Sequence, residues 1–80
     1  MNKNEILSVT QEIFRDIFDE DDMLIQDSTN SDDIEEWDSL NHINLVTSIE
    51  KEFNIRFALG ELVSLKNVGE MLNLIIEKLK

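Results

Sequence analysis

Apolar residues recur at intervals of three and four positions in three stretches of the chain, which is the period of an amphipathic helix. The first stripe consists of Ile6, Val9, Ile13 and Ile17, widened by Leu7, Phe14 and Phe18. Asn2 and Glu5 have the three-residue spacing of a capping box, which satisfies free N–H groups at a helix start. A helix is therefore predicted to begin next to Asn2.

The second stripe predicts a helix that begins near Asp38-Ser39 and stops at about Asn54. Its apolar positions are Leu40, Ile43, Val46, Ile49 and Phe53, and Leu45 broadens the face. The last helix is predicted from about Asn67, since Asn67 and Glu70 repeat the Asn-x-x-Glu start signal. It carries Val68, Met71, Leu72, Ile75 and Leu79, with Lys78 and Lys80 at the end where the helix dipole favours cations.

Residues 55–64 carry weaker signals. Ile55-Arg56-Phe57 is predicted to be a short extended link, and Ala58 to Ser64 one or two helical turns that carry Leu59, Leu62 and Val63. Together with the three stripes, this pattern predicts an all-α protein.

The connection from about Asp19 to Asp38 is long for a compact domain, where loops above roughly 12 to 15 residues are uncommon and tend to be functional. Its apolar residues are Met23, Leu24, Ile25, Ile34 and Trp37. A solvated linker needs no such residues, so several of them are expected to pin the loop across the helix ends. Trp37 is interpreted as such an anchor rather than as a contact for partners.

The composition favours one small domain over residues 1–80, soluble, cytoplasmic and without membrane insertion. No apolar run approaches the roughly 18 residues that a membrane span requires. Cysteine is absent and His42 is the single histidine, so neither a disulfide nor a zinc site is expected and no metal is predicted.

Charge narrows the classes of partner. The formal net charge is −11, and the segment between Arg15 and Lys51 holds twelve acidic residues without a lysine or arginine. Such a surface repels phosphate backbones and attracts basic protein faces, which excludes nucleic acid as a partner. The alternative is that the acids only keep a small protein soluble.

Residues that could carry chemistry gather at the start of the second predicted helix. If Ser39 were a hydrolase nucleophile, His42 would be its base and Asp38 would orient that base, but residues within one helical turn align poorly. A second interpretation requires only that Ser39 be exposed near a helix N-terminus, which favours an attached phosphate group. In a third, Asp38 or Ser39 merely caps the helix.

A resemblance decides between these interpretations. Asp38-Ser39-Leu40 opens a helix after a long acidic loop and before Ile43-Asn44-Leu45-Val46, and this arrangement resembles the phosphopantetheine attachment site of acyl carrier proteins. Further segments resemble that family in the same order: Asp27-Ser28-Thr29 with Ile34, residues 52–57 and residues 67–70.

The resemblance implies a four-helix bundle with a short third helix and a long loop between helices 1 and 2. It implies that a phosphopantetheinyl transferase attaches 4'-phosphopantetheine from coenzyme A to Ser39, with Asp38 and Leu40 beside it. The protein would then be no enzyme but a monomeric carrier of acyl or aminoacyl thioesters. Its other partners would be acyl-loading and acyl-using enzymes with basic faces.

The predicted partner contacts lie on the second helix: Asn41, His42, Asn44, Leu45 and Glu50. Carriers of fatty acid synthesis usually have acids just after the serine, whereas Asn41 and Asn44 are neutral here and Lys51 interrupts Glu50 and Glu52. This departure favours a specialised pathway, for which polyketide chemistry is one candidate, over bulk fatty acid biosynthesis. His42 is interpreted as a surface residue near the arm.

The alternative class is a small acidic protein-binding or calcium-binding module without a prosthetic group. The oxygen-bearing residues Asp27, Thr29, Ser31, Asp33, Glu35 and Asp38 have offsets reminiscent of a calcium loop. The pattern fails at Asp32, where glycine is needed for a sharp turn, and at Asp38, where a bidentate glutamate is expected.

Overall fold

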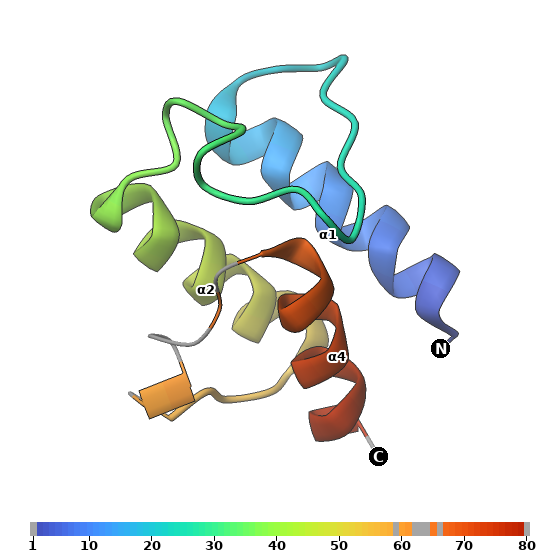
Figure 1. Cartoon of the computed structure of the whole chain (residues 1–80). Coiled ribbons are helices and arrows are strands. Elements are labelled where there is room, and N and C mark those ends of the chain that lie inside the picture. The colour runs from blue at the N-terminus through green and yellow to red at the C-terminus, as the bar shows by residue number, and fades with distance from the viewer. Residues whose placement is uncertain (1, 59, 62–64, 66, 80) are drawn as a thin grey trace.

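The computed structural model describes residues 2–58, 60–61, 65 and 67–79 of the chain (Figure 1). Within them lie three α-helices, α1 (Lys3–Phe18), α2 (Ser39–Phe53) and α4 (Val68–Leu79), and α1 packs against both others. The predicted all-α class is confirmed. Of the predicted third helix, Gly60 and Glu61 are helical, but Leu59, Leu62, Val63 and Ser64 lie outside the described residues. Four helices therefore stay a prediction.

Helix α1 begins at the predicted capping box. The Asn2 side chain accepts a hydrogen bond from the Glu5 N–H at 2.9 Å, and the Glu5 carboxylate accepts one from the Asn2 N–H at 3.0 Å. The fully buried line of the helix is Ile6, Thr10, Phe14 and Phe18, with Leu7, Val9, Ile13 and Ile17 half-buried at its margins. The predicted stripe is thus the right face, but its centre includes a threonine.

Helix α2 is capped by Asp38 and ends at Asn54, which adopts the left-handed conformation, so both predicted boundaries are confirmed. Its buried residues are Leu45, Val46, Ile49 and Phe53. The core prediction is wrong for Leu40 and Ile43, whose side chains are 69% and 57% exposed. At 3.6 residues per turn, these two project from the side of α2 that turns away from α1.

Helix α4 begins directly after Asn67, whose side chain accepts a hydrogen bond from the Glu70 N–H at 2.8 Å. Its buried residues are Val68, Met71, Leu72 and Ile75. Lys78 in the last turn pairs with Glu61 at 2.9 Å and so fastens the segment after α2 to this helix. Leu79, which the stripe placed in the core, is 40% exposed because it lies at the open end of the helix.

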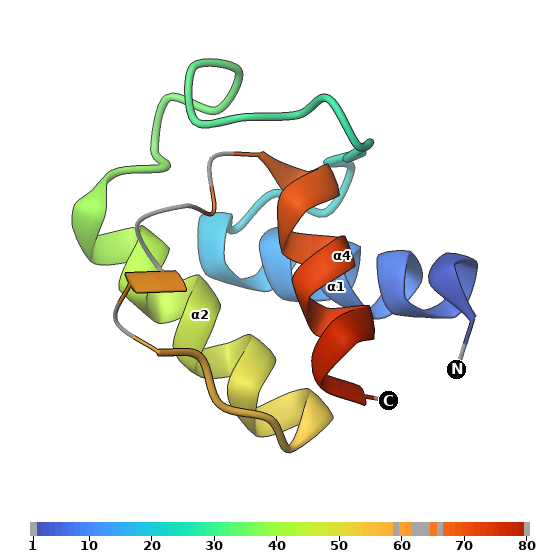
Figure 2. The ribbon, with the colours of Figure 1, turned by 60° about the horizontal axis from the view of Figure 1, so that its bottom comes forward.

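The long loop crosses the N-terminal end of α4, as the views in Figures 1 and 2 both show. Three side chains of the loop itself are buried, those of Ile25, Ile34 and Trp37, so the expected pinning is confirmed for these three. Leu24 is instead 78% exposed. The loop also caps α4 through its backbone, because the carbonyl of Thr29 accepts a hydrogen bond from the Val68 N–H at 2.8 Å. A helix start that would otherwise expose free N–H groups is thereby satisfied.

Candidate functional site

Ser39 is the first residue of α2 and its side chain is exposed. Asp38 caps the helix in an extended conformation, and its carboxylate accepts a hydrogen bond from the Asn41 N–H at 2.9 Å. Within the described part of the chain, the N–H groups of Ser39 and Leu40 have no protein partner, as is usual in a first helical turn. The site therefore presents a hydroxyl beside two available N–H groups.

The asparagines of the first turns hold this cap in place. The Asn41 side-chain amide donates to the Glu36 carbonyl at 2.8 Å and accepts from the Asn44 amide at 3.3 Å. Asn41 is half-buried, whereas Asn44 is exposed. Asn41 thus ties α2 to the loop. This structural role could not be inferred from the residue type alone.

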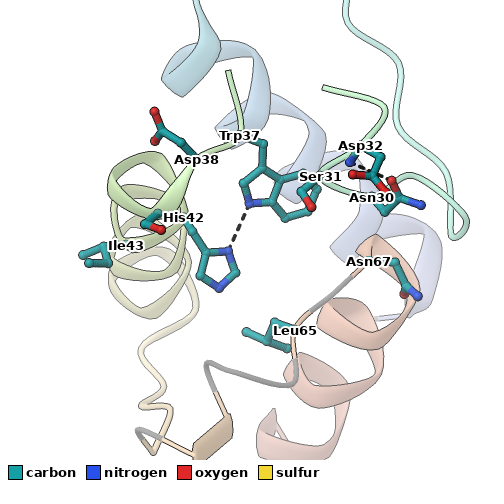
Figure 3. A pocket seen from close by; sticks show the side chains of 10 residues that line it. Asn30, Ser31, Asp32, Trp37, Asp38, His42, Ile43, Leu65 and Asn67 are labelled. Carbon is teal, nitrogen blue, oxygen red and sulfur yellow. Dashed lines mark hydrogen bonds between the residues drawn. The ribbon is translucent and has the colours of Figure 1, made fainter. Parts of the chain in front are cut away.

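Trp37 is anchored from two sides just before the cap. Its indole Nε1–H donates to Nδ1 of His42 at 3.0 Å (Figure 3), and the two rings are stacked with centroids 6.1 Å apart. Its ring also meets the Phe14 ring of α1 edge to face at 5.2 Å. With 6% of its surface exposed, Trp37 is the loop anchor that was predicted.

The internal role of His42 was missed at the sequence level. It precedes Leu45, Val46 and Ile49 by three, four and seven positions, so it shares the buried face of α2. That spacing was the available signal, and it is a better guide to the position than the polarity of the side chain. His42 is half-buried rather than a plain surface residue.

The hydrolase arrangement is not formed. A triad requires the aspartate to accept from Nδ1 of the histidine, but Nδ1 of His42 is itself an acceptor from Trp37. The Asp38 carboxylate instead caps α2.

An open hollow of about 840 Å³ lies beside the start of α2 (Figure 3). Its lining comprises Trp37, Ile43 and Leu65, together with the polar residues Asn30, Ser31, Asp32, Asp38, Ser39, His42 and Asn67. A volume of this size is within the range of small-molecule and cofactor sites. The exposed hydroxyl of Ser39 thus borders a space that can hold an attached group.

Comparison with known proteins agrees with this geometry. The family model described as the phosphopantetheine attachment site matches residues 8–75. The chain belongs to the acyl carrier protein family. The carrier is similar to the holo acyl carrier protein from Geobacter metallireducens, solved by NMR in solution, with 46% sequence identity and a TM-score of 0.85. That similarity covers 91% of this chain and 84% of the other. A search of curated proteins finds no match.

A carrier of this family is not an enzyme, and its cofactor is a covalently attached 4'-phosphopantetheine. The residues present fit that group, because an exposed hydroxyl, available first-turn N–H groups and the hollow lie together at the start of α2. When bound, the arm supplies a thiol that carries an acyl group as a thioester. The protein supplies its position and surroundings.

The predicted partner contacts of the carrier differ in exposure and in the hydrogen bonds that they make. Leu45 is fully buried against α1, so its assignment as a partner contact is wrong: its apolar side chain belongs to the core face of α2. Glu50 is half-buried and accepts a hydrogen bond from the Phe57 N–H at 2.8 Å, which holds the link after α2. Leu40, Ile43 and Asn44 remain exposed next to Ser39.

The calcium-loop pattern is engaged in other contacts. Thr29 is buried and its hydroxyl accepts from the Gln26 N–H, while Asp27 pairs with Lys3 at 2.7 Å. Among the described residues, no three His, Cys, Asp or Glu side chains gather closely enough to hold a metal ion. Nor does any helix within them have the length and apolar character needed to cross a membrane.

Proposed function

We propose that Ser39 is the residue that receives 4'-phosphopantetheine, flanked by Asp38 and Leu40. We further propose that residues 1–80 act as one monomeric carrier domain, a four-helix bundle with a short third helix. The observation that supports the assignment of Ser39 is its exposed hydroxyl at the start of α2, on the border of the hollow. The partners are then a phosphopantetheinyl transferase in the cytoplasm and the enzymes that load and use the acyl group.

Intact-protein mass tests this assignment after the apo protein is incubated with coenzyme A and a broad-specificity transferase. The wild type should gain one phosphopantetheine group, and Ser39→Ala should gain none. Ser31→Ala is the matched control, because Ser31 is also exposed and lines the same hollow. A wild type that stays unmodified would favour the alternative of an acidic binding module without an arm, and loss of modification in Ser31→Ala would contradict the choice of Ser39.

The pathway that we propose is a specialised biosynthetic one rather than bulk fatty acid synthesis. Between Ser39 and Ile49 helix α2 contains no carboxylate, and the exposed residues that follow Ser39 in its first turns are Leu40, Ile43 and Asn44. A partner that docks here meets apolar and amide groups, while the acidic loop attracts basic residues at the rim. Rim charges act mainly on the rate of encounter, and specificity is a difference between partners.

Elongation by the fatty acid synthase enzymes of the same cell tests the pathway. The loaded wild type should be a poor substrate, and Asn44→Glu should improve it by restoring an acid on the exposed face. Asn73→Glu makes the same charge change on the exposed side of α4 and should have no effect. Asn41→Asp is avoided because it would remove the amide that donates to Glu36. Efficient elongation of the wild type, unchanged by Asn44→Glu, would show an ordinary fatty acid carrier.

A further inference from the structure

The hydrogen bond between Trp37 and His42 can form in only one protonation state. Indole nitrogen is a donor and cannot accept, so Nδ1 of His42 has to be the acceptor in this 3.0 Å contact. A neutral imidazole can accept at Nδ1 while its proton resides on Nε2. A protonated imidazole carries hydrogen on both nitrogens and would oppose two N–H groups. Protonation of His42 therefore removes the acceptor from a buried indole.

We propose that the Trp37–His42 pair is a proton-sensitive latch that positions Ser39 for modification, with His42 as a positioning residue. Trp37 lies two residues before Ser39, and its backbone N–H donates to the Ile34 carbonyl at 3.0 Å. The residue between them, Asp38, caps α2. When the latch opens, the buried indole loses its partner, and the chain that carries the cap loses one of the contacts that hold it on α2, while the bonds of Asn41 to Glu36 and Asp38 remain. This inference rests on the proposal that Ser39 carries the arm.

Position matters here because the modifying enzyme must bring the serine oxygen in line with the pyrophosphate bond of coenzyme A. The new bond from serine oxygen to phosphorus forms as that pyrophosphate bond breaks, 3',5'-ADP leaves, and the serine proton passes to a base of the modifying enzyme. Displacements of about 1 Å in a reacting group can cost two orders of magnitude in rate. The net contribution of one hydrogen bond is enough to shift a local equilibrium about threefold to tenfold. The neutral form of His42 should therefore give the faster modification.

Among the described residues, the indole N–H donates to His42 and to no carboxylate. In the described residues, the carboxylates that line the same hollow are those of Asp32 and Asp38, and the second of these is engaged in the α2 cap. From α1 the group packed on Trp37 is the uncharged ring of Phe14, and from the α4 side the hollow is lined by Leu65 and Asn67. Nδ1 of His42 is thus the acceptor on which the latch depends.

Three variants separate the acceptor from the ring. His42→Asn places an oxygen on Cγ where Nδ1 stands, so it keeps an acceptor that does not titrate. His42→Phe keeps an aromatic ring for stacking but has no acceptor. Trp37→Phe keeps a ring in the core but removes the donor, so the state of His42 should no longer matter to Ser39.

The first readout is the indole N–H resonance of Trp37, which is unambiguous because the chain has one tryptophan. In the wild type it should move away from the bonded position once the pH is low enough to protonate the imidazole, because the protonated ring has no acceptor. In His42→Asn it should stay at the bonded position throughout. A wild-type resonance that does not move with pH, or moves equally in His42→Asn, would overturn the latch.

The second readout is the rate of phosphopantetheine attachment, measured as the ratio of wild type to His42→Asn in one reaction mixture so that the pH response of the transferase cancels. The ratio should fall about threefold to tenfold when the pH is lowered far enough to protonate the imidazole. The ratio of the Trp37→Phe rate to the His42→Asn rate should stay constant over the same change of pH. A constant wild-type ratio would overturn the positioning role.

The two readouts also separate this inference from the proposed function. An indole shift without attachment to any variant at any pH would overturn the proposed function together with the positioning role. Attachment that proceeds while the indole resonance is fixed would overturn the latch alone. The comparison of wild type with His42→Asn decides the matter even if His42→Phe does not fold.

Discussion

The N–H of Gly69 donates to the carbonyl of Asp27 over 2.9 Å, which brings the backbone of the loop against the first turn of α4. A Cβ on Gly69 would lie 3.0 Å from that carbonyl oxygen and 3.3 Å from Oδ1 of Asn67. Overpacking of this kind costs about 1–3 kcal/mol, more than the roughly 0.5–1 kcal/mol that alanine gains in a helix. Gly69→Ala should therefore lower the free energy of unfolding by about 1 kcal/mol in a denaturant titration.

Gly60 is the matched control for that substitution. It is helical, and a Cβ there would meet no atom within 4 Å. Gly60→Ala should raise the free energy of unfolding by up to about 1 kcal/mol, because alanine has the higher helix propensity. Equal effects at the two glycines would show that the close approach of Asp27 does not decide the cost at Gly69.

Thr10 has a fully buried hydroxyl with no hydrogen-bond partner among the described residues. Burying such a group unpaired costs about 1–3 kcal/mol in proteins. Thr10→Val removes the hydroxyl at nearly constant volume and should raise the free energy of unfolding by about 1 kcal/mol. Thr29→Val should have the opposite sign, since the buried Thr29 hydroxyl accepts from the Gln26 N–H at 3.0 Å. Destabilisation by both would mean that Thr10 is satisfied in solution.

Substitutions at Asp38 and Ser39 should separate the effect on stability from the effect on phosphopantetheine loading. Asp38 is the residue that caps α2, so Asp38→Ala should cost about 0.5–2 kcal/mol of stability. Ser39→Ala removes an exposed side chain and should change stability by less than about 0.5 kcal/mol while it abolishes loading. Thermal melts with intact mass test both changes, and an unfolded Ser39→Ala would indicate a structural rather than a functional serine.

Glu61 should make the fold sensitive to acid. The hydrogen bond from the Ala58 N–H and then the ammonium of Lys78 hold the pKa of this carboxylate below its usual value of 4.5. Because the unfolded chain takes up the proton at a higher pH, this contribution is complete above that value and is lost as pH falls through the folded pKa. The melting temperatures of wild type and Glu61→Gln should therefore differ at neutral pH and converge as the pH falls below 4.5 and through the folded pKa of Glu61. Lys78→Met should reduce the difference, and a gap independent of pH would contradict the assignment.

Local signals in the sequence determined the helices and the place of the site. Asn2 with Glu5, Asp38 before the second stripe and Asn54 after it are capping residues whose effect depends on near neighbours, so their positions fix helix ends without knowledge of the fold. The exposed serine at the start of α2 follows from the same local order.

Which face of α2 is buried was decided by the tertiary structure. Periodicity identifies a stripe, but the packing of α1 selects Leu45 for the core and leaves Leu40 and Ile43 outside. The pairing of Trp37 with His42, and the contact of Asp27 with Gly69, join residues whose sequence signals were read separately. Hydrogen bonds and close contacts depend on distance in space, and only the folded chain sets those distances.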